Sequence, residues 1–382
     1  MKAKLGDYIN EYSVRNKAGE DIPVYSVTNT QGFCQDYFGK EVASKDKSTY
    51  KIVPKGCFAY NPSRINVGSV DWQRFEERVI VSPLYNVFSV APQLDQQYLY
   101  YYLKSDFALQ RIRAVATGSV RDNLKLAMLY EFPIELPDID QQRDLASRLD
   151  RIKRIISLRE QELQVLDDLI RARFVEMFGN PATNPKGWEK YQLNDCLERI
   201  DNGKSFVCSD KPRVGDYPAV LKLSAATYGD YRPEDNKALL DENQFVEGAE
   251  VHSGDLLFTR KNTPELVGMA AYVQETPEKL MMPDLIFRLV TNDRMNPVFL
   301  WQLINCKEFR PIIQGISGGS AKSMSNISKE RLGKINVICP PRKIQDQLVP
   351  FVHQVDKSKS VVQKSLDKMQ LLFDSLMQQY FG

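Results

Sequence analysis

Two stretches of the chain repeat apolar residues at alternating spacings of four and three. Each pattern continues over about five heptads without an internal glycine, which is typical of a coiled coil rather than of an ordinary amphipathic helix. The heptad positions of the first stretch are Leu145, Leu149, Ile152, Ile156, Arg159, Leu163, Leu166, Ile170, Arg173 and Met177. Those of the second stretch are Leu348, Val352, Val355, Lys359, Val362, Leu366, Met369, Phe373, Leu376 and Tyr380. The alternative is that each helix packs only on the core of its own domain.

Charged residues occupy three of these heptad positions, Arg159, Arg173 and Lys359. One interpretation is that their long side chains carry the charge out to solvent. The other is that they fix the register and orientation of the helices, because a polar residue in the seam penalises wrong pairings. The sequence leaves both interpretations open.

The second helical stretch is a displaced copy of the first. "FVEMFG" ends at Gly179 and "LMQQYFG" ends at Gly382, an offset of 203 residues. With this offset Pro137 aligns with Pro340, and Gln142 aligns with Gln345. A period of this length is too long for a solenoid, so it indicates a duplicated domain that is followed each time by its helix.

The segments that precede the helices also match. "KLGDYI" resembles "QLNDCLERI", "PVYSVTNTQG" resembles "PAVLKLSAATYG", and "PKGCFAYNPSRINVG" parallels "HSGDLLFTRKNTPELVG". Short apolar alternations bounded by Gly, Pro and Asn predict strands and tight loops. We therefore predict an α+β fold, in which two pseudo-repeated globular domains are joined by two long antiparallel helices that form a coiled coil. The predicted boundaries are 1–138 for domain 1, 139–179 for helix 1, 180–341 for domain 2 and 342–382 for helix 2.

The composition is that of an ordinary folded protein. The 382 residues exceed what one hydrophobic core usually supports, and 43% are hydrophobic and 26% charged. No signal peptide or membrane-spanning run is present, so we expect a cytoplasmic protein without membrane contact. The six scattered cysteines favour free thiols over a zinc site. Because the net charge is only +2 and no segment is strongly basic, a DNA-binding face would have to be a local patch.

Three landmarks occur in order along this duplicated pattern. They are "FGNP" from Phe178, "SGDLLFTR" from Ser253 and "SGGSAKSMS" from Ser317. With them, nearly the whole chain resembles the specificity (S) subunit of a bacterial type I restriction-modification enzyme. The resemblance implies that each globular domain is a target recognition domain for double-stranded DNA.

The resemblance also implies that catalysis belongs to other subunits. Two methyltransferase (M) subunits would bind S-adenosylmethionine and methylate adenine, and two restriction (R) subunits would use ATP and Mg²⁺ for cleavage. The sequence agrees, because "SPLY" at Ser82–Tyr85 is only a near miss to an amino-methyltransferase tetrapeptide and "GISGG" lacks the Lys-Ser/Thr ending of a phosphate-binding loop. We therefore predict a non-enzymatic chain with no catalytic residue, metal or cofactor of its own.

Base readout requires side chains with paired donors and acceptors, mainly Arg or Lys for guanine and Asn or Gln for adenine. Loops that are rich in such residues, with Gly and Ser beside them, are the candidates. In domain 1 the predicted DNA-binding residues are Tyr60, Asn61, Ser63, Arg64, Ser119, Arg121 and Asn123. In domain 2 they are Thr259, Arg260, Lys261, Asn262, Ser320, Lys322, Ser323 and Asn326. The predicted docking residues for partner subunits are Gln141, Gln142, Arg143 and Gln345.

Two other classes of function remain open. One is an autonomous DNA-modifying or DNA-cleaving enzyme with an unrecognised active site, and the other is a duplicated adaptor that binds only protein. If the chain recognises DNA, its two dissimilar loops favour an asymmetric, bipartite target. Helices of about 38 residues, roughly 57 Å long at 1.5 Å per residue, would then fix an unread spacer between the half-sites. An antiparallel return of the second helix would also bring the two chain termini together.

Overall fold

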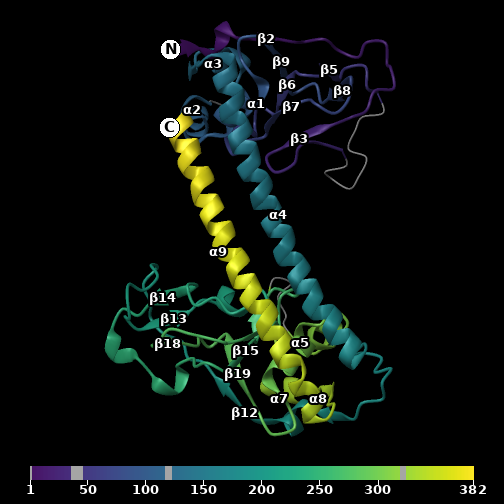
Figure 1. The fold of residues 1–382 in the computed structure, drawn as a ribbon, viewed down its shortest axis with the longest axis vertical. Coiled ribbons are helices and arrows are strands. Elements are labelled where there is room, and N and C mark those ends of the chain that lie inside the picture. The colour runs from purple at the N-terminus through teal and green to yellow at the C-terminus, as the bar shows by residue number, and fades with distance from the viewer. Residues whose placement is uncertain (1, 36–45, 117–122, 319–323) are drawn as a thin grey trace. The chain divides into compact units, whose positions relative to one another are not determined.

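The computed structural model describes residues 2–35, 46–116, 123–318 and 324–382. It comprises two compact units. Unit 1 contains Met1–Gln161 and Gln363–Gly382, and unit 2 contains Glu162–Val362. Each long helix therefore contributes residues to both units (Figure 1).

Unit 1 is built on an antiparallel four-stranded sheet with smaller strand pairs and three short helices around it. The sheet order is β2 (Ile9–Glu11), β9 (Asn86–Val90), β6 (Phe58–Tyr60), β7 (Val70–Trp72). The strand pairs are β1 (Lys2–Lys4) with β10 (Pro133–Glu135), β3 (Ser26–Thr28) with β4 (Gly32–Cys34), and β5 (Lys51–Pro54) with β8 (Arg78–Val81). The short helices are α1 (Gln96–Lys104), α2 (Asp106–Val115) and α3 (Leu126–Tyr130).

Unit 2 has a four-stranded sheet with the same connectivity. Its order is β12 (Leu197–Asn202), β19 (Ile286–Thr291), β15 (Leu256–Thr259), β17 (Ala270–Tyr272). The smaller sheets are β11 (Lys190–Gln192) with β21 (Asn336–Ile338), β16 (Lys261–Asn262) with β20 (Ser325–Asn326), and β14 (Asn236–Ala238), β13 (Ala219–Leu221), β18 (Leu280–Met281) in that order. The short helices are α5 (Pro297–Asn305), α6 (Arg310–Gly315), α7 (Lys329–Gly333) and α8 (Arg342–Asp346).

The predicted duplication is confirmed by these elements. Helix α7 follows α3 at the offset of 203 residues, and β21 follows β10 at the same offset. The match of "PVYSVTNTQG" with "PAVLKLSAATYG" holds in part, because Val24 bridges Ile80 of β8 in parallel, as β13 pairs in parallel with β18. Beside this bridge β8 pairs with β5 over four residues, whereas Met281 of β18 forms a single bridge with Glu250. The two units thus share the central sheet and helices but differ in the strands beside them.

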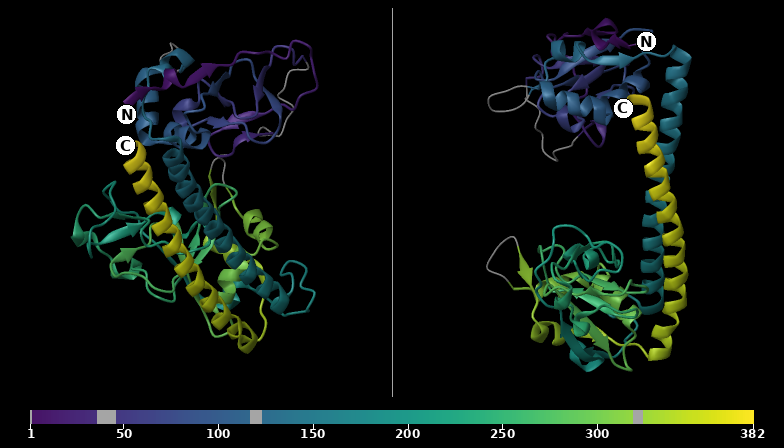
Figure 2. Two further views of the ribbon diagram at one scale, coloured as in Figure 1. Left: turned by 45° about the horizontal axis from the view of Figure 1, so that its top comes forward. Right: turned by 90° about the vertical axis from the view of Figure 1, so that its left-hand side faces the viewer.

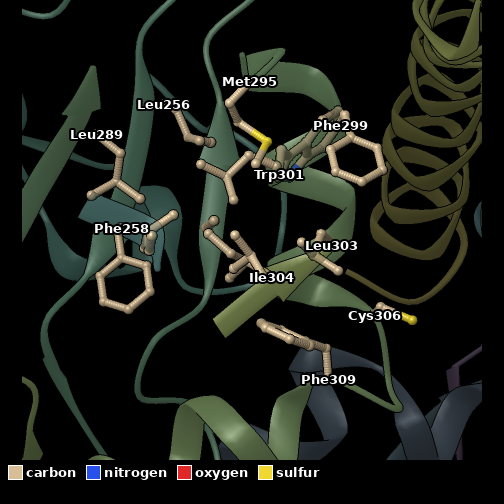
Figure 3. Packing of buried hydrophobic residues seen from close by; sticks show 14 of the residues in the cluster. Leu256, Phe258, Leu289, Met295, Phe299, Trp301, Leu303, Ile304, Cys306 and Phe309 are labelled. Carbon is tan, nitrogen blue, oxygen red and sulfur yellow. The ribbon is translucent and has the colours of Figure 1, made fainter. Parts of the chain in front are cut away.

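Each central sheet is covered by a short, well-capped helix. Asp95 caps α1 by accepting the backbone N–H groups of Gln97 and Tyr98 at 2.9 and 3.0 Å, and Asn296 caps α5 in the same way. In unit 2, Phe299, Leu303 and Ile304 of α5 pack on apolar side chains of the sheet. Figure 3 shows this core, which includes Leu256, Phe258 and Leu289 from the strands.

The two long helices are α4 (Ile139–Phe178), unbroken over 40 residues, and α9 (Leu348–Phe381), of 34 residues. All the predicted heptad positions are buried or half-buried, which confirms the coiled-coil pattern. Within unit 1 the side chain of Arg148 bonds to Tyr380, and within unit 2 Lys359 Nζ lies 2.6 Å from an Asp167 carboxylate oxygen. The two helices therefore run antiparallel in each unit (Figure 2). The Lys359–Asp167 pair favours the register interpretation of the charged seam residues.

The predicted start of the second helix is corrected by the structure. Residues 342–382 do not form one helix, because α8 ends at Asp346 and α9 begins at Leu348. Pro350 explains the break, since it has no N–H to donate to the carbonyl of Asp346 and its ring crowds that group. The aligned position in the first copy is Ser147, and α4 passes through it without interruption.

Both long helices end with a phenylalanine in a domain core. Phe381, the last residue of α9, packs in unit 1 with its ring centre 5.1 Å from that of Tyr98. Phe178, the last residue of α4, packs in unit 2 with its ring centre 4.7 Å from that of Phe299. Strand β1 pairs with β10, and Gly382 lies beside β10 as well, so the predicted proximity of the two termini is confirmed.

Two aligned glutamines are fully buried at the bases of the long helices. Gln142 accepts the Asp95 N–H at 2.9 Å and donates to the carbonyls of Gln93 and Pro137. Gln345 accepts the Asn296 N–H at 2.8 Å and donates to the carbonyls of Arg294 and Pro340.

These bonds correct the prediction that Gln142 and Gln345 dock partner subunits. Neither side chain has surface to offer, and each instead fixes the capped start of α1 or α5 against the chain that enters a long helix. Gln141 and Arg143 are exposed, and their predicted docking role stands as a prediction.

Replacing Phe381 with alanine should destabilise unit 1 by about 3–5 kcal/mol, the usual cost of deleting a buried phenylalanine ring. The control is Leu371→Ala on the same helix, where the side chain is 71% exposed and the change should stay within about 0.5 kcal/mol. Urea unfolding of the full chain measures both variants. Equal midpoints for the two would show that the Phe381 ring does not hold unit 1 together.

Replacing Gln345 with leucine should lower the free energy of unfolding by at least about 2 kcal/mol, because a buried donor and two carbonyls lose their partner. Gln141→Leu is the matched control on an exposed glutamine and should leave stability unchanged. Thermal unfolding of the isolated chain is the measurement. A stable Gln345→Leu chain that fails to assemble with other subunits would restore the docking role.

Candidate nucleic-acid interface

In unit 2 the two segments predicted to read DNA lie side by side. Strand β16 pairs antiparallel with β20, so that Lys261 faces Asn326 and Asn262 faces Ser325. The Ile327 N–H also donates to the Arg260 carbonyl at 2.8 Å. Residues more than 60 positions apart in the sequence thus form one two-stranded ridge.

Arg260 is half-buried and directly precedes β16. The guanidinium carbon lies 4.9 Å from the ring centre of Phe287, and Nε donates to Asn326 Oδ1 at 3.4 Å. Stacking on an aromatic ring and one hydrogen bond restrict the side chain without occupying all of its donors. Arg260 is therefore preorganised to present its remaining N–H groups to a ligand.

Thr259 and Asn262 have a supporting role instead. Thr259 is fully buried, and its hydroxyl accepts the Met269 N–H at 3.0 Å. Asn262 is also buried, and its amide donates to the Thr227 hydroxyl at 3.1 Å. Their predicted direct contact with bases is corrected, because these bonds and the surrounding core leave little surface for DNA. Lys261 and Asn326 are half-buried and stay in the predicted reading set.

Unit 1 brings its two predicted loops together in the corresponding way. The Leu124 N–H donates to the Pro62 carbonyl at 3.1 Å, and the Tyr60 hydroxyl donates to the Leu124 carbonyl at 3.1 Å. Tyr60 is fully buried, and burial raises the pKa of its hydroxyl. It therefore joins the loops from beneath, which corrects its predicted contact with bases.

Two of the predicted loop residues of unit 1, Asn61 and Arg64, line an open pocket of 470 Å³. The Asn61 side-chain oxygen accepts the N–H and hydroxyl of Ser63 at 3.1 and 2.9 Å, which shapes the turn. Asn61 and Arg64 line the pocket together with Asn29 and with Leu84. Arg64 and Asn123 are exposed. This pocket is where polar side chains from separate loops of unit 1 converge.

Five predicted DNA-binding residues lie outside the described residues. They are Ser119, Arg121, Ser320, Lys322 and Ser323.

One cation beside Arg260, Lys329, was not predicted from the sequence. Lys329 donates to the Ile200 carbonyl and lies 5.7 Å from the Phe287 ring centre, beside Arg260. Lys329 is the first residue of the short helix α7, which Ser328 caps, and nothing else in its sequence context marks it. The sequence does not indicate that Arg260 and Lys329 both lie over the buried ring of Phe287.

The described part of the chain was compared with the requirements of a metal site and of a membrane-spanning helix. No group of three or more His, Cys, Asp or Glu side chains there could hold a metal ion. None of its helices has the length and apolarity needed to span a bilayer.

Comparisons with known proteins match this architecture. The specificity subunit of the type I restriction enzyme EcoEI from Escherichia coli is 27% identical over 259 residues, covering 66% of this chain and 43% of that protein. The EcoKI specificity subunit from Escherichia coli K12 is 23% identical over 306 residues, covering 74% and 63%. The chain thus spans about half the length of the curated relatives it matches.

Solved structures share the fold. The S subunit of a type I restriction-modification system from M. genitalium superposes with a TM-score of 0.61 at 13% identity, covering 100% of this chain and 96% of that one. A chain from a study of complex assembly and conformational transition in the type I R-M system gives a TM-score of 0.54 at 17% identity, covering 100% and 97%.

The family model described as the type I restriction modification DNA specificity domain matches residues 3–168 and again residues 185–369. The two matches coincide with the two copies of the repeat, each with its sheet, its capped helix and its paired loops. The chain therefore belongs to the family of type I restriction modification DNA specificity domains.

Proposed function

We propose that this chain is the DNA sequence-recognition subunit of a type I restriction-modification complex. The observation that carries the proposal is that in both units two loops far apart in the sequence meet and carry exposed or half-exposed polar side chains. Membership of the specificity-domain family supports double-stranded DNA as the ligand. The autonomous-enzyme alternative has no support in the family match.

Each unit would read one half of a bipartite target. The side chains of Asn61–Arg64 in unit 1 (Asn-Pro-Ser-Arg) follow a different order from those of Arg260–Thr263 in unit 2 (Arg-Lys-Asn-Thr). Different donors and acceptors select different bases. We therefore propose an asymmetric target.

Two M subunits with S-adenosylmethionine and two R subunits with ATP and Mg²⁺ would supply the chemistry. Exposed apolar residues on the long helices support a protein-binding surface, because such side chains are usually covered. They include Leu158, Leu169, Leu371 and Leu372. Gln141 and Arg143 remain the predicted polar docking residues.

Methyl transfer measured with the purified chain, and then with the methyltransferase subunit of its own system added, tests this division of labour. Activity only in the mixture, at one defined sequence, is the expected result. Methyl transfer by the chain alone would favour an autonomous enzyme. An assembled complex without sequence-selective DNA binding would favour a protein-only adaptor.

Replacing Arg260 with alanine should weaken specific binding by about 1–3 kcal/mol and relax the preference at one base position, since a bidentate contact to a base would be lost. The control is Arg294→Ala, which removes another arginine stacked on an aromatic ring, 5.1 Å from the centre of Tyr191. Binding to a panel of single-base target variants is the measurement. Equal weakening across the whole panel would mean that Arg260 contacts a phosphate.

Inserting one heptad into each long helix should change the spacer of the target. Insertion after Gln161 in α4 and after Val362 in α9 keeps the seam in phase and adds about 10.5 Å to each helix, near three base pairs, with a rotation of about 100° around the duplex. The expected variant keeps both half-site sequences and either prefers a longer spacer or loses affinity. Selection from a library with randomised spacers measures this, and an unchanged spacer at unchanged affinity contradicts it.

A further inference from the structure

A pocket of 440 Å³ in unit 1 lies between α1, α4 and α9. Its basic groups are Lys104 and Lys153, and Glu160 is the only acidic residue among the described residues that line it. The rest of the lining is neutral and includes Asn29, Tyr100 and Phe373. We call this cavity the unit 1 pocket.

Unit 2 holds the same pocket at the equivalent position, with a volume of 540 Å³. On the long helices, Gln370, Phe373 and Met377 of the unit 1 pocket follow Asp167, Ile170 and Phe174 of the unit 2 pocket by 203 residues. On the short helices, Trp301, Gln302 and Asn305 follow Tyr100, Tyr101 and Lys104 by 201 residues. The two cavities are therefore copies produced by the duplication.

The two copies differ in charge. In unit 2 the lining contains the carboxylates of Asp167, Asp168, Asp230 and Glu308 against the cations of Arg171, Lys307 and Lys359. Asp167 neutralises Lys359 directly at 2.6 Å. Lys104 is replaced by Asn305, and the residue aligned with Lys153 is Asp356. The unit 1 lining thus carries two cations and one carboxylate, whereas the unit 2 lining carries three cations and four carboxylates, with Asp167 and Asp168 in ion pairs with Lys359 and Arg171.

Neither lysine of the unit 1 pocket has a carboxylate within ion-pair distance among the described residues; Asp71 is near enough to offset part of the fall in the pKa of Lys104, and Lys153 donates to the Tyr100 hydroxyl at 3.3 Å. Their ammonium groups lie 5.5 Å (Lys104) and 5.3 Å (Lys153) from the ring centre of Tyr100. Asp150, one turn before Lys153, accepts from Gln97 and from Tyr101 at 2.8 and 2.6 Å. Two cations thus share one aromatic ring and repel each other, and a bound anion would relieve that repulsion.

The unit 1 pocket adjoins the loops predicted to read DNA. Lys104 donates to the Asn29 carbonyl at 3.1 Å and to the Gly68 carbonyl, which ends the Asn61–Gly68 loop. Asn29 also lines the cavity that holds Asn61 and Arg64. Arg113 donates to Asn66 of the same loop at 3.2 Å. Every base that a loop reads has a charged phosphate beside it, and phosphate contacts set the register of readout.

We propose that the unit 1 pocket binds one phosphate of the DNA backbone next to the half-site read by unit 1, and that the unit 2 pocket does not. The inference rests on the proposed function and adds that only one of the two pockets contacts a phosphate. Lys153 is the exposed contact, and Lys104 positions the reading loop while adding its charge. Burial lowers the pKa of Lys104 to about 8, so a neighbouring phosphate would also keep this group protonated.

The test uses the full chain assembled with its methyltransferase subunits. The ligand is a DNA duplex that contains the sequence at which this complex transfers methyl groups. Affinity is measured between low and moderate salt for wild type and for Lys153→Gln. Loss of one phosphate contact should reduce the slope of log K against log salt by about 0.9, with equal loss for all single-base variants of the target. Arg154→Gln, the neighbouring exposed cation outside the pocket lining, should keep the wild-type slope.

A duplex series with single neutral methylphosphonate linkages locates the contact. One linkage beside the unit 1 half-site should weaken wild type and have no further effect on Lys153→Gln. A wild-type slope in Lys153→Gln, or additive effects at every linkage, would overturn the inference. A normal slope with weaker methyltransferase assembly would do so too, since the pocket would then hold a protein carboxylate. Absence of selective binding by the wild-type complex would instead refute the proposed function.

Discussion

The burial of a phenylalanine at the end of each long helix is the constraint on which the architecture depends. Phe178 completes the core of unit 2, and Phe381 completes the core of unit 1. The first half of α4 contributes Leu149 to the unit 1 core, so α4 supplies side chains to both cores. The antiparallel helix α9 contributes its first residues to the unit 2 core and its last residues to the unit 1 core. The duplication therefore yields two cores that each require both helices.

The two interactions next to this constraint are local and polar. The buried glutamines fix the direction in which the chain enters a long helix, because each joins a helix cap to the segment before that helix. The Lys359–Asp167 pair then restricts sliding of one helix on the other within unit 2. Apolar heptads alone would tolerate a shift by one repeat, and a charged residue in the seam makes such a shift unfavourable.

Much of the fold follows from periodicity, which the sequence displays directly. The heptads and the offset between the copies were predictable, because helical spacing and repetition do not depend on distant contacts. The pairing of β16 with β20 does depend on such contacts and was not predicted. The burial of individual side chains was not predictable either. Thr259, Gln142 and Gln345 are polar residues of kinds that are mostly exposed, and Tyr60 carries a polar hydroxyl at the end of β6. Their burial depends on backbone groups of other segments. Leu124, Gln93 and Arg294 lie 64, 49 and 51 positions from their partners, and Met269 lies 10 positions from Thr259.

Unit 1 is formed by two separate segments of the chain, and this affects when it can fold during synthesis. Residues 162–362 are contiguous, so a chain that ends just after Val362 already holds the whole core of unit 2. Unit 1 contains the first residues of the sequence, yet its core lacks Phe373, Leu376 and Phe381 until the end of α9 has left the ribosome. The domain that is made first is thus finished last. A ribosome that stops early would release a chain with one folded domain and one open apolar core, which is the kind of surface that chaperones and proteases recognise.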